Sequence, residues 1–170
     1  GGLSVGGDAL HHGRHRPDGL EPNPKRRIDD GTVLLGASAF PLADVVGAVL
    51  RRVGHEATRV AGQRPDVLVL SHPAGWGPVR RLTLSDAARA GGLPAPVFVP
   101  EPVAAAMYFT SVLGGTVPPG TALIVYDFGA GTFDVTVLRA GESFEVLGSD
   151  GLDDVGGLDV DAAVVGWLRP

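Results

Sequence analysis

Alternating apolar and polar side chains dominate the last third of the chain. An apolar run over residues 123–126 ends on Asp127, and after a short turn Phe133, Val135 and Val137 alternate with polar residues. This period-2 spacing is typical of half-buried strands. The pattern therefore predicts three consecutive strands followed by a helix, over residues 122–127, 132–138 and 143–148 and then from about Gly157.

The middle of the chain alternates between strand and helix patterns. Apolar residues at helical spacing after Pro41 predict an amphipathic helix to about Thr58, and the continuous apolar run at 67–70 predicts a buried strand. A helix, a second strand and another helix follow, over 79–90, 97–99 and 101–113. This order implies parallel strands joined by helical crossovers, and hence an α/β fold.

The first 39 residues have no clear period, apart from weak strand signals at 3–5 and 33–35. They contain His11, His12 and His15 in a basic stretch. No acid or cysteine completes a set of metal ligands there, so the stretch is interpreted as a solvated loop.

The turn after Asp127 carries the clearest chemistry. Residues 129–132 read Gly-Ala-Gly-Thr, and Asp134 follows at the start of the next predicted strand. Glycines let backbone amides approach an anion closely, and two acids beside a phosphate are consistent with a hydrated divalent cation. A Rossmann turn would need a third glycine and a following helix, and a P-loop would need Gly-Lys-Ser/Thr. The hairpin predicts a nucleotide phosphate site, with an ordinary glycine turn as the alternative.

Composition narrows the classes of partner. Fourteen basic and nineteen acidic residues give a net charge of −5, which argues against nucleic acid or an anionic membrane. The absence of cysteine excludes disulfides and thiolate metal sites and is consistent with a cytoplasmic location. No apolar run reaches membrane-spanning length. Lys25 is the single lysine among the fourteen basic residues, which fits either a need for a compact point charge or chance.

Five segments in order resemble the ATPase domain of the 70-kDa heat-shock chaperones, in the actin-like ATPase superfamily. They cover residues 23–28, 73–87, 101–106, 127–135 and 156–161. The resemblance implies an actin-like (ribonuclease H-like) fold with mixed sheets flanked by helices. It also implies parts of two lobes, residues 1–116 and 117–170, with a linker at 114–120.

The resemblance also implies roles for individual residues. The expected catalytic residues are Lys25, Glu101, Asp127, Thr132 and Asp134. The two aspartates and Glu101 would hold Mg²⁺ mostly through water. The expected phosphate-binding residues are Gly129, Ala130, Gly131 and Thr132, with Gly156 and Gly157 also at the nucleotide. Pro73 and Arg81 would relay nucleotide state to a partner domain.

The function implied is Mg²⁺-dependent hydrolysis of ATP to ADP and phosphate in a chaperone of the stress response. Unfolded client proteins and co-chaperones would bind through regions outside this chain. The first phosphate loop and the adenosine pocket are also expected outside it, so the isolated chain is expected to be inactive. A non-catalytic relative of the same fold and a sugar or acid kinase are the alternatives. Ala130 stands where the family usually has glycine, which requires a negative φ there.

Overall fold

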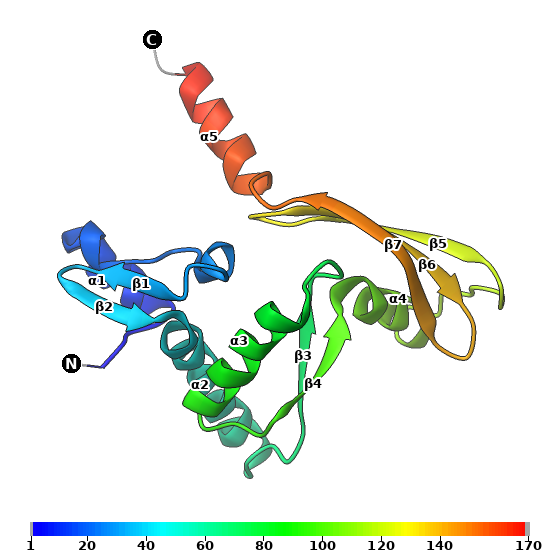
Figure 1. The fold of residues 1–170 in the computed structure, drawn as a ribbon, viewed down its shortest axis with the longest axis horizontal. Helices are drawn as coiled ribbons and strands as arrows, with labels where there is room; N and C mark the ends of the chain where they lie inside the picture. Colours follow the sequence, from blue (N-terminus) through cyan, green and yellow to red (C-terminus); the bar gives the residue numbers. More distant parts are fainter. Residues whose placement is uncertain (1, 169–170) are drawn as a thin grey trace. The chain divides into compact units, whose positions relative to one another are not determined.

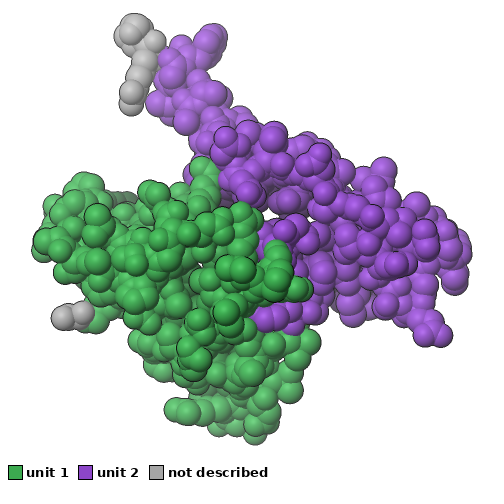
Figure 2. Space-filling view, in the orientation of Figure 1, with its two compact units in different colours: residues 1–70, 77–97 green, residues 71–76, 98–170 purple. Residues whose placement is uncertain are grey.

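The computed structural model describes residues 2–168. Its helices and strands, drawn in Figure 1, group into two compact units that are coloured separately in Figure 2. The first unit contains the residues up to 70 together with 77–97. The second contains 71–76 together with the residues from 98 onward.

The first unit opens with helical segments and a small hairpin. These are α1 (Gly7–His15), the 3₁₀ turns η1 (Pro17–Gly19) and η2 (Pro24–Arg27), and the strands β1 (Thr32–Leu35) and β2 (Ser38–Pro41). The two strands pair antiparallel, with Leu35 opposite Ser38. Gly36 lies in the connecting turn with a φ of 62°, a backbone conformation that favours glycine.

Two helices form the body of this unit, α2 (Leu42–Ala61) and α3 (Pro78–Ala90). Leu42 and Val45 of the apolar stripe are buried together with Ala48, whereas Val49 and Val53, which the helical spacing also predicts in the core, are exposed. The helices approach closely because Gly47 has no side chain. A Cβ atom there would lie 2.8 Å from the Ala87 carbonyl oxygen. The helix α2 extends three residues beyond the predicted end at Thr58, to Ala61, and Gly62 caps it with a φ of 73°.

The strands β3 (Leu68–His72) and β4 (Pro96–Pro100) pair with each other in a two-stranded sheet. The helix α3 lies between them in the sequence, as the alternating pattern predicts. The expected burial of residues 67–70 is wrong, because one face of this two-stranded sheet is uncovered and leaves Val67 and Val69 exposed. His72 is buried, and its Nδ1 donates a hydrogen bond of 2.7 Å to the Pro73 carbonyl oxygen. Its ring also contacts Phe98 edge-on.

The second unit contains α4 (Glu101–Ser111), an antiparallel sheet of β5 (Ala122–Phe128), β6 (Phe133–Ala140) and β7 (Phe144–Leu152), and α5 (Gly157–Leu168). The helix α4 contacts all three strands. It covers the face that carries Thr136, Leu138 and Ala140, all buried. On the opposite face Ile124 and Tyr126 are exposed. The predicted three-strand meander is therefore confirmed, with one apolar face packed on a helix and one uncovered.

The beginning of the chain differs from the sequence interpretation. The expected loop around His11 is the helix α1, and residues 3–5 do not form a strand. The side chain of Leu20 packs against Gly13, so contact with a following segment supports a helix that its weak hydrophobic pattern does not indicate. The strand β2 is also not predicted from the sequence, because residues up to 39 show no clear period and Pro41 is interpreted as the start of a helix. The lobe ranges 1–116 and 117–170 stay a prediction, and their ends at residues 1, 169 and 170 lie outside the described residues.

Candidate functional site: the β5–β6 turn

The predicted phosphate turn is a tight antiparallel hairpin. Asp127 on β5 lies directly opposite Asp134 on β6, and Phe128 lies opposite Phe133. The Gly129 amide donates a hydrogen bond of 3.0 Å to the Thr132 carbonyl oxygen and closes the turn. Directly opposed residues of an antiparallel pair project from the same face of the sheet. The structure therefore brings the two predicted carboxylates together at one end of the sheet.

The backbone of the turn explains the substitution at position 130. No described residue other than glycine has a positive φ, so Ala130 adopts a conformation open to any L-amino acid. The expectation that Ala130 has a negative φ is therefore confirmed. The Gly129 amide is used within the hairpin, so an anion contact from Gly129 would require that hydrogen bond to open.

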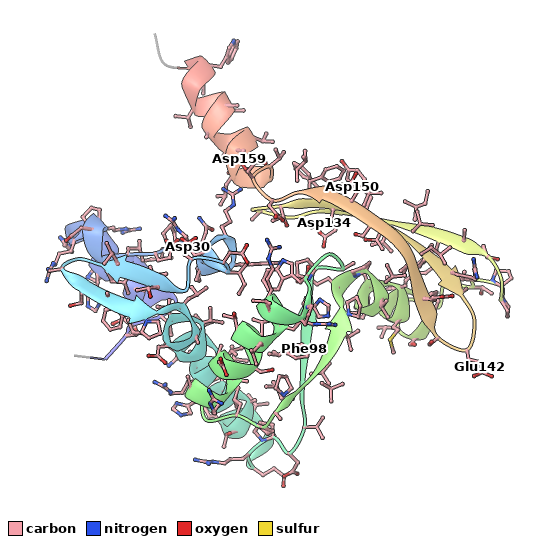
Figure 3. All side chains as sticks on the ribbon, viewed as in Figure 1. Asp30, Phe98, Asp134, Glu142, Asp150 and Asp159 are labelled. Atoms are coloured by element: carbon pink, nitrogen blue, oxygen red, sulfur yellow. The ribbon has the colours of Figure 1, made fainter. Side chains whose placement is uncertain are left out.

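The first turn of α5 is hydrogen-bonded to this hairpin. The amides of Gly157 and Leu158 donate hydrogen bonds of 2.9 Å to the carbonyl oxygens of Gly129 and Ala130. The Asp159 carboxylate accepts a hydrogen bond of 2.8 Å from the Gly156 amide and so caps the helix start. Figure 3 labels Asp134 and Asp159, from β6 and α5. The glycine pair thus joins the phosphate turn to the N-terminus of α5, whose first amides donate to the hairpin carbonyls and to the Asp159 carboxylate.

Close packing explains why position 156 is glycine. A Cβ atom on Gly156 would lie 2.5 Å from the Ala130 carbonyl oxygen and 2.7 Å from the Gly131 carbonyl carbon. Both are backbone atoms, which cannot move aside as a flexible side chain can. At Gly157 the nearest atom would be 3.7 Å away, an ordinary contact. The two adjacent glycines therefore have different structural roles.

The remaining acid predicted for this site is at the start of α4. Glu101 is the first residue of that helix, is half-buried, and precedes Pro102, which suits the first turn. Asp134 is also half-buried, whereas Asp127 is exposed. Within residues 2–168, no three His, Cys, Asp or Glu side chains are placed to hold one metal ion directly. A role for Glu101 with the two aspartates through water stays a prediction.

The other predicted residues belong to separate parts of the fold. Lys25 is exposed in η2, in the first unit. Arg81 is half-buried in α3 of the same unit. The segments that carry Lys25 and Arg81 are joined by Arg80, which donates hydrogen bonds of 3.0 and 2.6 Å to the two Asp29 carboxylate oxygens. The Arg80 guanidinium lowers the pKa of the Asp29 carboxyl.

Pro73 belongs to the second unit and is buried. Its carbonyl oxygen accepts a hydrogen bond from the Trp76 amide at 3.0 Å, in addition to the one from His72. These two hydrogen bonds hold the turn after β3, so the structure gives Pro73 a local role. The proposed relay of nucleotide state through Pro73 is not tested by this geometry.

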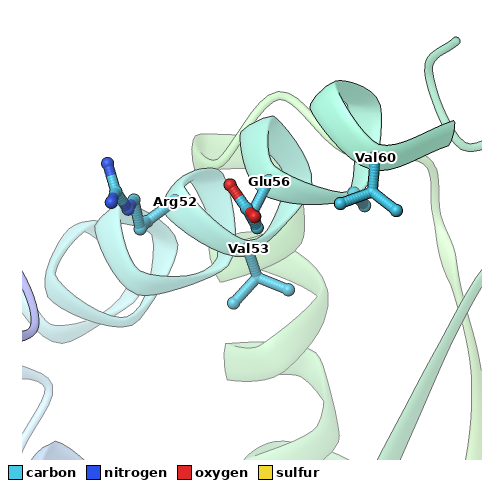
Figure 4. Close-up of a pocket in the computed structure, with 5 residues that line it drawn as sticks. Arg52, Val53, Glu56 and Val60 are labelled. Atoms are coloured by element: carbon cyan, nitrogen blue, oxygen red, sulfur yellow. The ribbon is translucent and has the colours of Figure 1, made fainter. Parts of the chain in front are cut away.

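Surface concavities of the first unit lie away from these residues. One follows the exposed side of α2 and is lined by Arg52, Val53, Glu56, Ala57 and Val60 (Figure 4). Another lies between the end of α2 and the segment 89–94. Neither is lined by a residue predicted from the sequence to bind nucleotide.

Comparison with known proteins places the chain in a family. The family model described as "Hsp70 protein" matches residues 27–170. The chain belongs to the Hsp70 family. This is a family of ATP-binding chaperones with an actin-like ATPase fold, and the mixed α/β architecture of this chain agrees with it. The matched region begins two residues after Lys25 and includes the other predicted site residues.

Matches to individual Hsp70 relatives show what share of their length this chain covers. It is 33% identical over 147 residues to the stromal 70 kDa heat shock-related protein, chloroplastic, of Pisum sativum, covering 84% of this chain and 20% of the relative. It is 34% identical over 126 residues to chaperone protein DnaK of Thermus thermophilus, and this match covers 74% of this chain and 20% of the relative. It is 30% identical over 167 residues to chaperone protein DnaK of Elusimicrobium minutum, and this match covers 96% of this chain and 26% of the relative. The chain spans about a fifth to a quarter of these proteins. Among residues 2–168, every helix is too short or too polar to cross a membrane.

Gly151 is a residue of this site that the sequence analysis missed. It lies opposite Asp134 on β7, and a Cβ atom there would be 2.8 Å from the Asp134 Oδ1 and 2.5 Å from the Phe133 carbonyl oxygen. The glycine therefore leaves room for the Asp134 carboxylate. The predicted strand ended at residue 148, whereas β7 continues to Leu152, so the sequence analysis placed Gly151 outside any strand.

We expect Gly151→Ala to displace the Asp134 carboxylate and to lower Mg²⁺-dependent ATP hydrolysis in the full-length Hsp70 protein by about tenfold or more. The matched control is Gly148→Ala on the same strand, where an added Cβ meets nothing within 4 Å. Steady-state hydrolysis assays with both variants test this. Equal activity of the two variants would show that the space beside Asp134 has no role in the reaction.

Proposed function

We propose that this chain is part of an Hsp70-type ATPase domain, which binds Mg-ATP and hydrolyses it to ADP and phosphate. The observation that supports this most directly is the β5–β6 hairpin. It opposes Asp127 to Asp134, and hydrogen bonds join its turn to the first turn of α5. A glycine turn suits a phosphate, and paired carboxylates suit a hydrated cation.

The placement of two carboxylates directly opposite each other on β5 and β6 requires a physical explanation. Like charges directly across an antiparallel pair destabilise the sheet. A hydrated Mg²⁺ between Asp127 and Asp134 would remove that repulsion and would present its waters to a phosphate. When bound, Mg²⁺ supplies charge neutralisation for phosphoryl transfer. The two carboxylates would hold the hydrated ion through its waters, Thr132 would contact the phosphates, and Glu101 would orient the attacking water.

The wider roles follow from the family resemblance. Lys25 would reach the terminal phosphate from the first lobe, and Gly156 with Gly157 would border the nucleotide. Pro73 and Arg81 would transmit the nucleotide state to a client-binding region, with unfolded proteins and co-chaperones as partners. A cytoplasmic location fits the absence of cysteine, although two relatives are named as chloroplastic.

The alternative is a non-catalytic module of the same fold that binds nucleotide or a protein without hydrolysing ATP. The presence of Lys25, Glu101, Asp127, Thr132 and Asp134 favours the catalytic function. Single-turnover hydrolysis by the full-length protein separates the two. Phosphate release that depends on Mg²⁺ supports an ATPase, whereas binding of ATP without turnover supports the alternative.

The role of Lys25 has its own test. Lys25→Arg is expected to lower hydrolysis in the full-length protein by on the order of a hundredfold, because a planar guanidinium does not reproduce a compact ammonium at a phosphate. Arg26→Lys, the adjacent change in the same 3₁₀ turn, is the control and should leave hydrolysis unchanged. Wild-type turnover in Lys25→Arg would remove Lys25 from the site.

We expect the isolated 170-residue chain to lack ATPase activity and to self-associate. The uncovered face of the β5–β6–β7 sheet exposes Ile124, Tyr126 and Phe128, and exposed apolar faces favour association. Light scattering alongside calorimetric titration with Mg-ATP tests both statements. A monodisperse monomer that binds ATP at micromolar affinity would contradict them.

A further inference from the structure

The helix α1 places two histidines on one exposed face. His11 and His15 are four residues apart, a spacing that brings side chains together on a helix surface. Their ring centres are 5.6 Å apart and the rings are inclined by 74°. His12 also contacts His11, with ring centres 6.1 Å apart, but consecutive helix residues project in different directions.

The other side of α1 is held against the first unit. Gly13 is buried, and its Cα approaches Leu20 so closely that a Cβ atom would lie 2.5 Å from the Leu20 Cδ2. At 100° per residue, Gly13 lies on the side of the helix opposite His11 and His15. Both histidines are exposed. The anchored helix thus presents the pair outward from a fixed backbone.

We propose that His11 and His15 form a binding site for a divalent transition metal ion such as Zn²⁺, Ni²⁺ or Cu²⁺. Imidazole nitrogens bind these ions at about 2.0–2.1 Å, which sets two ligating rings roughly 5 Å apart at a tetrahedral angle. The observed separation is close to that value, so side-chain rotation alone brings a nitrogen of each ring to one ion. The helix backbone does not have to move.

The site has two protein ligands, and water completes the coordination. Within residues 2–168, no third His, Cys, Asp or Glu is placed to join a metal site. Asp8 lies one turn earlier at a spacing of three from His11, and its negative charge favours a cation on this face. Two ligands on adjacent turns act as a chelate, because binding of the first imidazole raises the effective concentration of the second.

Calorimetric titration of the full-length, tag-free protein with ZnCl₂ or NiCl₂ tests the proposal. Excess Mg²⁺ is included to occupy the oxygen-rich sites, because Mg²⁺ prefers oxygen ligands and leaves imidazoles available. We expect one saturable site that His11→Ala and His15→Ala each weaken by on the order of a hundredfold. His12→Ala is the matched control and should leave the affinity unchanged, because it removes a neighbouring imidazole without removing the pair.

A second measurement depends on the geometry of the helix. A metal ion that joins adjacent turns favours the helical state, so Zn²⁺ should slow amide hydrogen exchange in residues 11–16 of the wild type and not of His15→Ala. Equal loss of affinity in all three alanine variants would overturn the assignment of the pair. Absence of a saturable site, or protection of α1 that persists in His15→Ala, would overturn the site itself.

Discussion

The variant Asp127→Asn is expected to lower Mg²⁺-dependent ATP hydrolysis by the full-length protein on the order of a hundredfold or more, with a much smaller effect on nucleotide affinity. Asparagine keeps the size and position of the side chain opposite Asp134 but removes its charge. The charge matters most when negative charge develops on the transferred phosphoryl group and the hydrated cation must be held in place. The expected signature is a reduced kcat with a nearly unchanged Kd for ATP.

A control separates this effect from a general loss of surface charge. Glu142 lies in the β6–β7 turn, at the opposite end of β6 from the candidate site. We expect Glu142→Gln to hydrolyse ATP at the wild-type rate. Unchanged turnover in Asp127→Asn, or an equal loss in both variants, would remove Asp127 from the mechanism.

The same substitution has a second consequence in the absence of metal. Because two like charges face each other across β5 and β6, replacing Asp127 with asparagine relieves a repulsion. The metal-free variant should therefore be as stable as the wild type, or more stable by about 0.2–1 kcal/mol. Thermal unfolding without Mg²⁺ measures this, and a large loss of stability would indicate a structural role for Asp127.

The variant Leu138→Ala is expected to lower the free energy of unfolding of the second unit by about 2–5 kcal/mol. Leu138 is 0% exposed, on the face of β6 that α4 covers, so truncation leaves a cavity and loses apolar contacts. Urea denaturation at low protein concentration, followed by circular dichroism, measures the change.

The matched control for that variant is Leu147→Ala on the neighbouring strand. Leu147 is 44% exposed, beside the irregularity where Val137 pairs with Gly148 and Leu138 pairs with Val146. Leu147→Ala should lower the free energy of unfolding much less than Leu138→Ala, because solvent fills the space that the exposed side chain leaves. Similar losses for Leu138→Ala and Leu147→Ala would mean that α4 does not protect this face in solution.

The strands around the candidate site were predictable for a simple reason. Alternation of apolar and polar residues reports directly which face of a strand is buried, and this rule located the ends of β5 and β6 to within two residues. The opposition of Asp127 and Asp134 also follows from a short glycine turn between regular strands. The helix α2 was found in the same way, and only its last turn was missed, where Gly62 provides the cap.

Local spacing was enough to predict the strand–turn–strand unit with its two acids, and five sequence motifs carried the resemblance to the Hsp70 family. The folded chain was needed to reveal the hydrogen bonds between α5 and the turn, the space that Gly151 leaves for Asp134, and the helical state of the histidine segment. Each of these depends on atoms brought together from separate segments: Gly156 against Ala130, Gly151 against Asp134, and Gly13 against Leu20. A glycine in a sequence permits either a positive φ or a close approach, and which of the two applies is known only after the chain has folded.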